Sequence, residues 1–219
     1  TAEISSSTAV VMQTVAGNKA AIGYISLGSL DNTVKAVKVD GVEATADNVK
    51  NGTYPICRPF NIATKGDLSD AAKDFIAFIQ SDEGQQVITD KGCVSTGSTG
   101  AFTSGNPTGT VVVEGSSSVT PVMEKLAEAY MAINSGVTVK VQQSDSSTGM
   151  TSAIEGTYDI GMASRELKED EAAALAHQAI AMDGIAVIVN LENPTEDMTV
   201  EQIASIFLGD ATKWNEMVK

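Results

Sequence analysis

Apolar residues along this chain follow two spacings, one typical of strands and one typical of helices. Residues 111–113 are three consecutive valines, which predict a buried strand, and residues 137–141 alternate between valine and polar residues, which predicts a half-exposed strand. Residues 69–80 place their large apolar side chains on one side of a helix that Ser69 and Asp70 cap. Strands and helices predicted in this way alternate along the chain, an order typical of α/β proteins with a mainly parallel sheet.

The remaining elements follow the same two patterns. Strands are predicted at residues 20–27, 34–39, 158–163 and 179–189, and helices at 9–16, 45–50, 85–89, 120–130, 150–154, 169–177 and 203–207. Two prolines favour an extended conformation for residues 54–63. Residues 95–109 consist almost entirely of Gly, Ser, Thr, Asn and Pro, which is the composition of a linker.

Composition narrows the class of protein. A chain of 219 residues suits one large or two small domains, and 42% hydrophobic with 19% charged residues indicates a globular protein. The formal net charge of -14 argues against nucleic acid or an anionic membrane surface as a partner. The chain has no long apolar run, no initiator Met and no signal peptide, so we expect a soluble chain that was processed or engineered.

The chain has few residues suited to metal binding or covalent chemistry. Cys57 and Cys93 have no metal-binding spacing, and we expect two buried thiols, with a single disulfide as the alternative. His177 is the only histidine, is expected on the surface of a helix, and is the only base candidate for Ser117 as a nucleophile. Because Gly-x-Ser-x-Gly is absent and Asp145, Asp159 and Asp183 lack acid/base spacing, we expect no enzyme, no metal and no cofactor.

Three polar loops each follow a predicted strand in the second half of the chain. They are Gly115–Ser118, Ser144–Gly149 and Ser164–Arg165. Loops at the carboxyl ends of strands in an open α/β sheet converge on one crevice, where serine hydroxyls and helix N-termini suit a tetrahedral oxyanion. Helix capping explains each loop alone, and an ion pair with Glu166 or Glu169 explains Arg165 alone. Taken together, the three loops predict anion binding.

Two of these loops carry a family resemblance. Residues 115–123 resemble the first phosphate loop of the phosphate-binding proteins of bacterial phosphate ABC transporters, and residues 159–168 resemble that family's next loop. Further similar segments lie at residues 21–27, 54–59, 183–190 and 206–216. The resemblance implies a two-lobed α/β fold of the periplasmic-binding-protein type II, which binds phosphate in a cleft between the lobes. It also implies a parent that is extracellular or periplasmic, lipid-anchored in Gram-positive bacteria, and docks on a transporter permease.

The segments stand in a different order from the family's. Residues 1–95 resemble its later part and residues 109–219 its earlier part, so we expect a circular permutant. The absence of an initiator Met and a signal peptide favours an engineered permutation, with a natural one as the alternative. The first lobe would be 56–95 and 109–185, the second 1–55 and 186–219, with 96–108 joining the original termini. The family's Arg/Glu-x-Gly-Ser-Gly-Thr-Arg loop is not found, so the second lobe is expected to be incomplete and phosphate binding weakened. The alternative is a permuted or split scaffold that self-associates or binds a partner strand or complementing peptide.

The resemblance also assigns roles to single residues. Ser117 and Ser118 would bind phosphate oxygens through hydroxyl and N–H groups, and Ser147 would add a hydroxyl. Ser164 stands where some family members have an Asp that accepts the phosphate proton, which leaves selectivity against sulfate open. Arg165 would either contact the phosphate or orient the loops.

Overall fold

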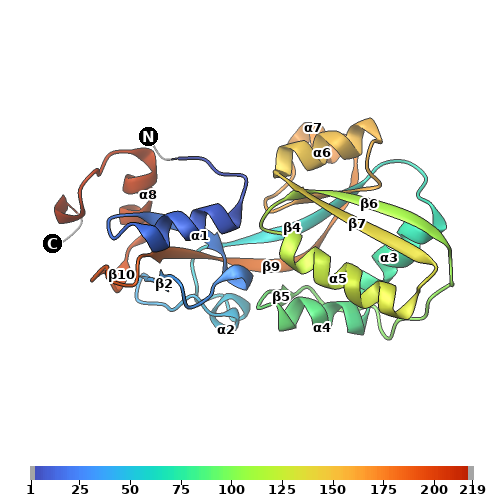
Figure 1. The fold of residues 1–219 in the computed structure, drawn as a ribbon, viewed down its shortest axis with the longest axis horizontal. Helices are drawn as coiled ribbons and strands as arrows, with labels where there is room; N and C mark the ends of the chain where they lie inside the picture. Colours follow the sequence, from blue (N-terminus) through green and yellow to red (C-terminus); the bar gives the residue numbers. More distant parts are fainter. Residues whose placement is uncertain (1–2, 217–219) are drawn as a thin grey trace. The chain divides into compact units, whose positions relative to one another are not determined.

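The computed structural model describes residues 3–216, which divide into two compact units. Unit 1 comprises Thr1–Cys57 and Gly184–Lys219, and unit 2 is Arg58–Asp183 (Figure 1). The two ends of the predicted second lobe, residues 1–2 and 217–219, lie outside the described residues. Strands and helices are mixed throughout, which confirms the predicted α/β class.

The sheet of unit 2 is built around one central strand. Strand β6 (Gly109–Ser116) lies between β7 (Val137–Ser144) and β8 (Ile160–Ala163) and is parallel to both. Antiparallel pairs join β4 (Cys57–Thr64) to β8 and β5 (Val94–Ser95) to β9 (Ala176–Val189). The sheet is therefore mixed, and the prediction of a mainly parallel sheet holds only around β6.

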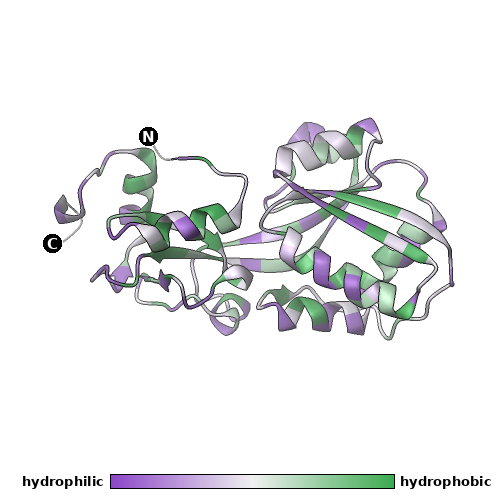
Figure 2. Cartoon of the chain, in the orientation of Figure 1, coloured by the Kyte–Doolittle hydropathy of each residue, from purple (hydrophilic) through white to green (hydrophobic). Residues whose placement is uncertain are grey.

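Helices cover both faces of this sheet (Figure 1). One face carries α3 (Asp70–Gln80), α4 (Asp82–Asp90) and α5 (Thr120–Ile133), and the other carries α6 (Ser146–Glu155) and α7 (Glu169–Ala174). Neighbouring strand residues point to opposite faces, so Ile62 belongs to the large core with α3 and α5, whereas Ala63 packs with Met150 of α6. Figure 2 shows the apolar residues gathered in these strands and helices.

Unit 1 is organised around the second half of β9. Strand β1 (Ile22–Ser26) and strand β2 (Lys35–Ala36) both pair with β9 in antiparallel fashion, and α1 (Thr8–Gly17) packs its Val15 against Ile25 and Ile188. The remaining elements are η1 (Leu27–Ser29), β3 (Lys38–Val39), α2 (Ala46–Lys50), β10 (Asp197–Met198), α8 (Val200–Leu208) and η2 (Trp214–Glu216). The strand predicted at 34–39 is divided because its first part pairs with β9 and its second part with β10.

Residues 96–108 form neither helix nor strand, as their composition predicts, yet they are held firmly. The Phe102 ring lies 5.2 Å from that of Phe78 and 6.0 Å from that of Tyr130, measured between centroids. The Asp74 carboxylate accepts hydrogen bonds from the Ser104 hydroxyl and the Gly105 N–H, each at 2.8 Å. The segment is therefore packed onto unit 2, and its role in joining original termini stays a prediction.

Two local predictions are wrong. Helix α7 ends at Ala174, so His177 lies in β9 rather than in a helix, because the chain turns extended at Leu175. Cys57 is exposed at the start of β4 and only Cys93 is buried, and both thiols are free, so neither the pair of buried thiols nor the alternative disulfide is present. Within residues 3–216, every helix is too short or too polar to cross a membrane.

Candidate functional site

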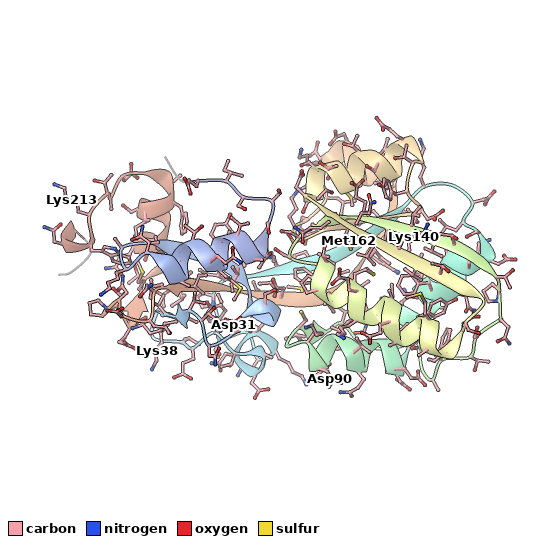
Figure 3. All side chains as sticks on the ribbon, in the orientation of Figure 1. Asp31, Lys38, Asp90, Lys140, Met162 and Lys213 are labelled. Carbon is pink, nitrogen blue, oxygen red and sulfur yellow. The ribbon has the colours of Figure 1, made fainter. Side chains whose placement is uncertain are left out.

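Strands β6, β7 and β8 end side by side, and glycines in β6, β8 and α6 allow these elements to approach one another closely. A Cβ atom at Gly115 would lie 2.2 Å from the carbonyl oxygen of Met162, which is buried in β8 and labelled in Figure 3. A Cβ atom at Gly149 would lie 2.7 Å from the Cα of Gly115, and one at Gly161 would lie 2.5 Å from the Gly149 carbonyl oxygen. Only glycine fits at these three positions.

Serine hydroxyls connect the ends of the three strands. The Ser116 hydroxyl donates to the Ser164 hydroxyl at 2.9 Å, and the Ser164 N–H donates to the Ser146 hydroxyl at 3.1 Å. The Ser118 N–H donates to the Ser116 hydroxyl at 3.3 Å. The structure therefore brings the three predicted loops together at one edge of the sheet in unit 2.

The loop after β6 leads into the longest helix of unit 2. Pro121 lies in the first turn of α5, as predicted, and the Thr120 hydroxyl donates to the Ser116 carbonyl at 3.1 Å. Residue Val119 occupies the N-cap position and offers no side-chain acceptor to the helix. Ser117 and Ser118 are half-buried just before this helix begins, where the positive end of the helix dipole lies.

The loop after β7 is shorter than predicted, because α6 begins at Ser146 and Ser147 lies in its first turn. The Asp145 carboxylate caps this helix, accepting the Ser147 N–H at 2.8 Å and the Thr148 N–H at 3.0 Å. Hydrogen bonds from the Thr148 hydroxyl and backbone hold the pKa of Asp145 below its usual value. A carboxylate of the chain itself therefore already occupies the N-terminus of α6.

The loop after β8 contains an ion pair. The guanidinium of Arg165 donates to both oxygens of Glu171 at 2.7 and 2.8 Å, and it also donates to the Glu166 carbonyl at 3.0 Å and to the Ser147 hydroxyl at 3.2 Å. The bond from Arg165 lowers the pKa of Glu171, which is buried. The carboxylate partner of Arg165 is thus Glu171, not Glu166 or Glu169 as the alternative reading of the sequence proposed.

Of the three aspartates considered for acid/base chemistry, Asp145 caps α6 and the other two also have structural roles. The Asp159 side chain accepts the Val112 N–H at 2.8 Å, and the buried Asp183 pairs with Arg58 at 3.2 Å. His177 is exposed, and its ring contacts the Leu175 carbonyl. No cluster of three or more His, Cys, Asp or Glu residues suited to a metal occurs within the part of the chain described.

Known proteins are similar in sequence to this chain over nearly all of its length. A family profile described as the PBP superfamily domain matches residues 1–83 and 100–218. Phosphate-binding protein PstS 2 of Streptococcus agalactiae serotype V is 49% identical over 220 residues, which are 100% of this chain and 75% of the relative. Phosphate-binding protein PstS 2 of Streptococcus pneumoniae serotype 4 is 47% identical over 218 residues, which are 99% of this chain and 75% of the relative.

A solved structure is similar over the same extent. The crystal structure of the phosphate-binding protein of a phosphate ABC transporter from Streptococcus pneumoniae TIGR4 matches with a TM-score of 0.79 and 47% identity, covering 100% of this chain and 85% of that one. Since the sequence alignments run along the whole chain, these relatives carry its segments in the same order. The predicted permutation relative to other family members, and the predicted missing segment, stay predictions.

Proposed function

Because this chain belongs to the PstS family of phosphate-binding proteins, we propose that it binds inorganic phosphate, without catalysing a reaction, where β6, β7 and β8 end in unit 2. The observation that carries the proposal is the start of α5, a long helix with three serines before it and no side-chain cap at Val119. The dipole of this helix and the serines that precede it favour an anion at this point.

The neighbouring helices support the choice of α5. The first N–H groups of α6 are bonded to Asp145, and the Lys168 N–H before α7 is bonded to Glu171 at 2.8 Å. These helix ends therefore satisfy their donors from within the chain, whereas α5 has no such carboxylate. A tetrahedral phosphate placed there lies next to donors from Ser117 and Ser118 and within the hydroxyl network that contains Ser164.

Each proposed residue has a stated role. Ser117 and Ser118 bind phosphate oxygens through hydroxyl and N–H groups, Ser147 and Ser164 contribute hydroxyls, and Arg165 either contacts the phosphate or orients the loops. Hydroxyl and N–H donors stabilise a bound anion locally through their dipoles, so binding does not require a positively charged protein, and the net charge of -14 does not exclude it. A hydrogen bond to a charged group contributes about 1.5–3 kcal/mol, so a few such contacts give useful affinity.

The wider setting follows from the relatives. The similar crystal structure is of a component of a phosphate ABC transporter, so we infer that this chain delivers phosphate to such a transporter from outside the cytoplasmic membrane. Weaker binding than in longer family members, the sequence-based prediction, is part of the proposal. The weaker binding can be tested by titrating phosphate into this chain and into the S. agalactiae relative, because the aligned region covers only 75% of that relative.

Calorimetric titration tests the proposal itself. We expect heat when phosphate is added to the unaltered chain. Ser117→Ala and Ser118→Ala should each bind phosphate about tenfold more weakly or worse, because each removes one charge-assisted hydrogen bond. Ser135→Ala, an exposed serine just past the far end of α5, is the matched control and should bind as the unaltered chain does. Absence of heat with the unaltered chain, or equal losses at Ser118 and Ser135, would refute the assignment.

A further inference from the structure

Glu171 holds Arg165 from inside unit 2. The side chain of Glu171 is only 7% exposed, whereas that of Arg165 is 30% exposed. Two parallel N–H···O bonds of 2.7 and 2.8 Å join them, a fork geometry that fixes orientation as well as distance. The same carboxylate accepts the Lys168 N–H at 2.8 Å, which anchors it at the start of α7.

The other contacts of Arg165 come from different elements. Its guanidinium donates to the Ser147 hydroxyl in the first turn of α6, and its backbone carbonyl accepts the side-chain amide of Asn61 at 2.9 Å. Asn61 is buried in β4, directly opposite Ala163 of β8. Arg165 is therefore tied at both its backbone and its side chain to three elements around the loop.

These contacts leave the guanidinium little freedom to bind anything else. An arginine has five N–H donors, four of them on the two terminal nitrogens. The terminal nitrogens of Arg165 make four hydrogen bonds, two to Glu171 and one each to Glu166 and Ser147. A phosphate oxygen would have to displace one of these acceptors, and the adjacent carboxylate of Glu171 would oppose the approach of an anion.

Arg165 is well placed to position the serines instead. It follows Ser164 directly in the chain, and Ser164 shares hydrogen bonds with Ser116 and with Ser146. Moving Arg165 would therefore move the Ser164 hydroxyl and release the Ser147 hydroxyl at the same time. Catalytic and binding groups are generally held in place by such surrounding residues.

We propose that Glu171 is a positioning residue of the phosphate site: it fixes Arg165, and through Arg165 it sets the positions of the Ser147 and Ser164 hydroxyls. The inference rests on the proposed phosphate binding, and it assigns Arg165 to orienting the loops rather than to contacting the anion. Glu171 itself does not touch phosphate.

Phosphate titration of Glu171→Gln is the first test. The amide keeps an acceptor for the Lys168 N–H but loses the charged fork to Arg165, and we expect affinity to fall about tenfold, the scale known for second-layer residues of metal sites. Arg165→Met should show a similar loss, and the double variant should lose no more than either single one, because both changes break the same link. Glu128→Gln, which removes the charge of an exposed Lys125 pair on α5, is the matched control and should bind normally.

A second measurement does not depend on phosphate. In Glu171→Gln without ligand, the backbone amide resonances of Ser147 and Ser164 should shift, while those around Glu128 should not. Unchanged or tighter phosphate binding in folded Glu171→Gln, additive losses in the double variant, or unshifted serine resonances would each overturn the inference. If the unaltered chain gives no heat with phosphate while the serine resonances shift as expected, the proposed function fails and the positioning contact stands.

Discussion

Replacing Gly115 by alanine tests whether the close approach of β6 and β8 builds the site. Gly115 has a φ of +149°, which alanine rarely adopts, and an added Cβ would lie 2.2 Å from the Met162 carbonyl oxygen and 2.8 Å from the Met162 nitrogen. Both neighbours are backbone atoms of a buried strand, so they cannot rotate away. Forcing atoms into a packed core costs about 1–3 kcal/mol and the backbone strain a similar amount, so we expect a loss of about 3 kcal/mol.

Urea unfolding followed by circular dichroism measures this loss. Gly156→Ala is the matched control: Gly156 also has a positive φ, +73° at the end of α6, but nothing lies within 4 Å of the added Cβ. That variant should lose only about 1 kcal/mol, the cost of strain alone. If Gly115→Ala falls within the error of Gly156→Ala, the argument from close strand approach is refuted. Phosphate affinity should also fall in Gly115→Ala, because Ser116 follows the displaced residue directly.

Three further predictions concern charge and burial. Burial raises the pKa of Asp74, but hydrogen bonds from Gly105, Tyr130, Ser104 and Asn134 together lower it by more than burial raises it. The pKa of Asp74 in the folded protein therefore lies below its ordinary value. The difference in unfolding free energy between the unaltered chain and Asp74→Asn should therefore be fully present above the ordinary pKa and shrink as the pH falls through the lower folded pKa. Urea unfolding at a series of pH values measures this difference, and a difference that grows on acidification would contradict the prediction. Cys57 should react with a thiol reagent in the native protein and Cys93 only after unfolding, since burial, with the nearby Asp183 charge, raises the pKa of Cys93 to about 12; two fast thiols would contradict this. The rate of phosphate association should rise with ionic strength, because salt screens the repulsion between phosphate and a net charge of -14. Stopped-flow measurements can follow this rate, and a rate that falls with added salt would indicate a positively charged site and contradict the prediction.

The strand, turn and helix around Ser117 were predictable from the sequence because every signal there is local. Three consecutive valines predict a buried strand, and Pro121 suits the first turn of a helix. Gly115, which was expected in the polar loop, lies instead inside β6, where it allows the close approach of β8. The resemblance to phosphate-binding proteins and the periplasmic-binding-protein fold are likewise confirmed by relatives that match over the whole chain. Local patterns of strand, turn and helix residues, found in several segments of the chain, are therefore enough to predict the fold class.

The partner of Arg165 was not predictable in the same way. Glu166, Glu169 and Glu171 all lie within six residues of Arg165, and sequence spacing does not decide among them. The choice depends on α7, in which the Glu171 side chain is buried and that of Glu169 is exposed. Glu166, which precedes the helix, is also exposed. The position of Glu171 in the sequence, three residues after Lys168, was the one available signal, because a Glu at the third helical position commonly bonds the N-cap N–H, as Glu171 does here.

The three polar loops looked equivalent in the sequence, and the charges near them separate them. Glu171 pairs with the guanidinium of Arg165 and Asp145 interacts with it electrostatically, so α6 and α7 bring no surplus positive charge to the site. Attraction for an anion must then come from backbone N–H groups, hydroxyls and the dipole of α5, which act over short distances. An acidic protein can hold a small anion in this way, provided that the donors lie close together, and Gly115 in β6, Gly149 in α6 and Gly161 in β8 allow these elements to approach closely.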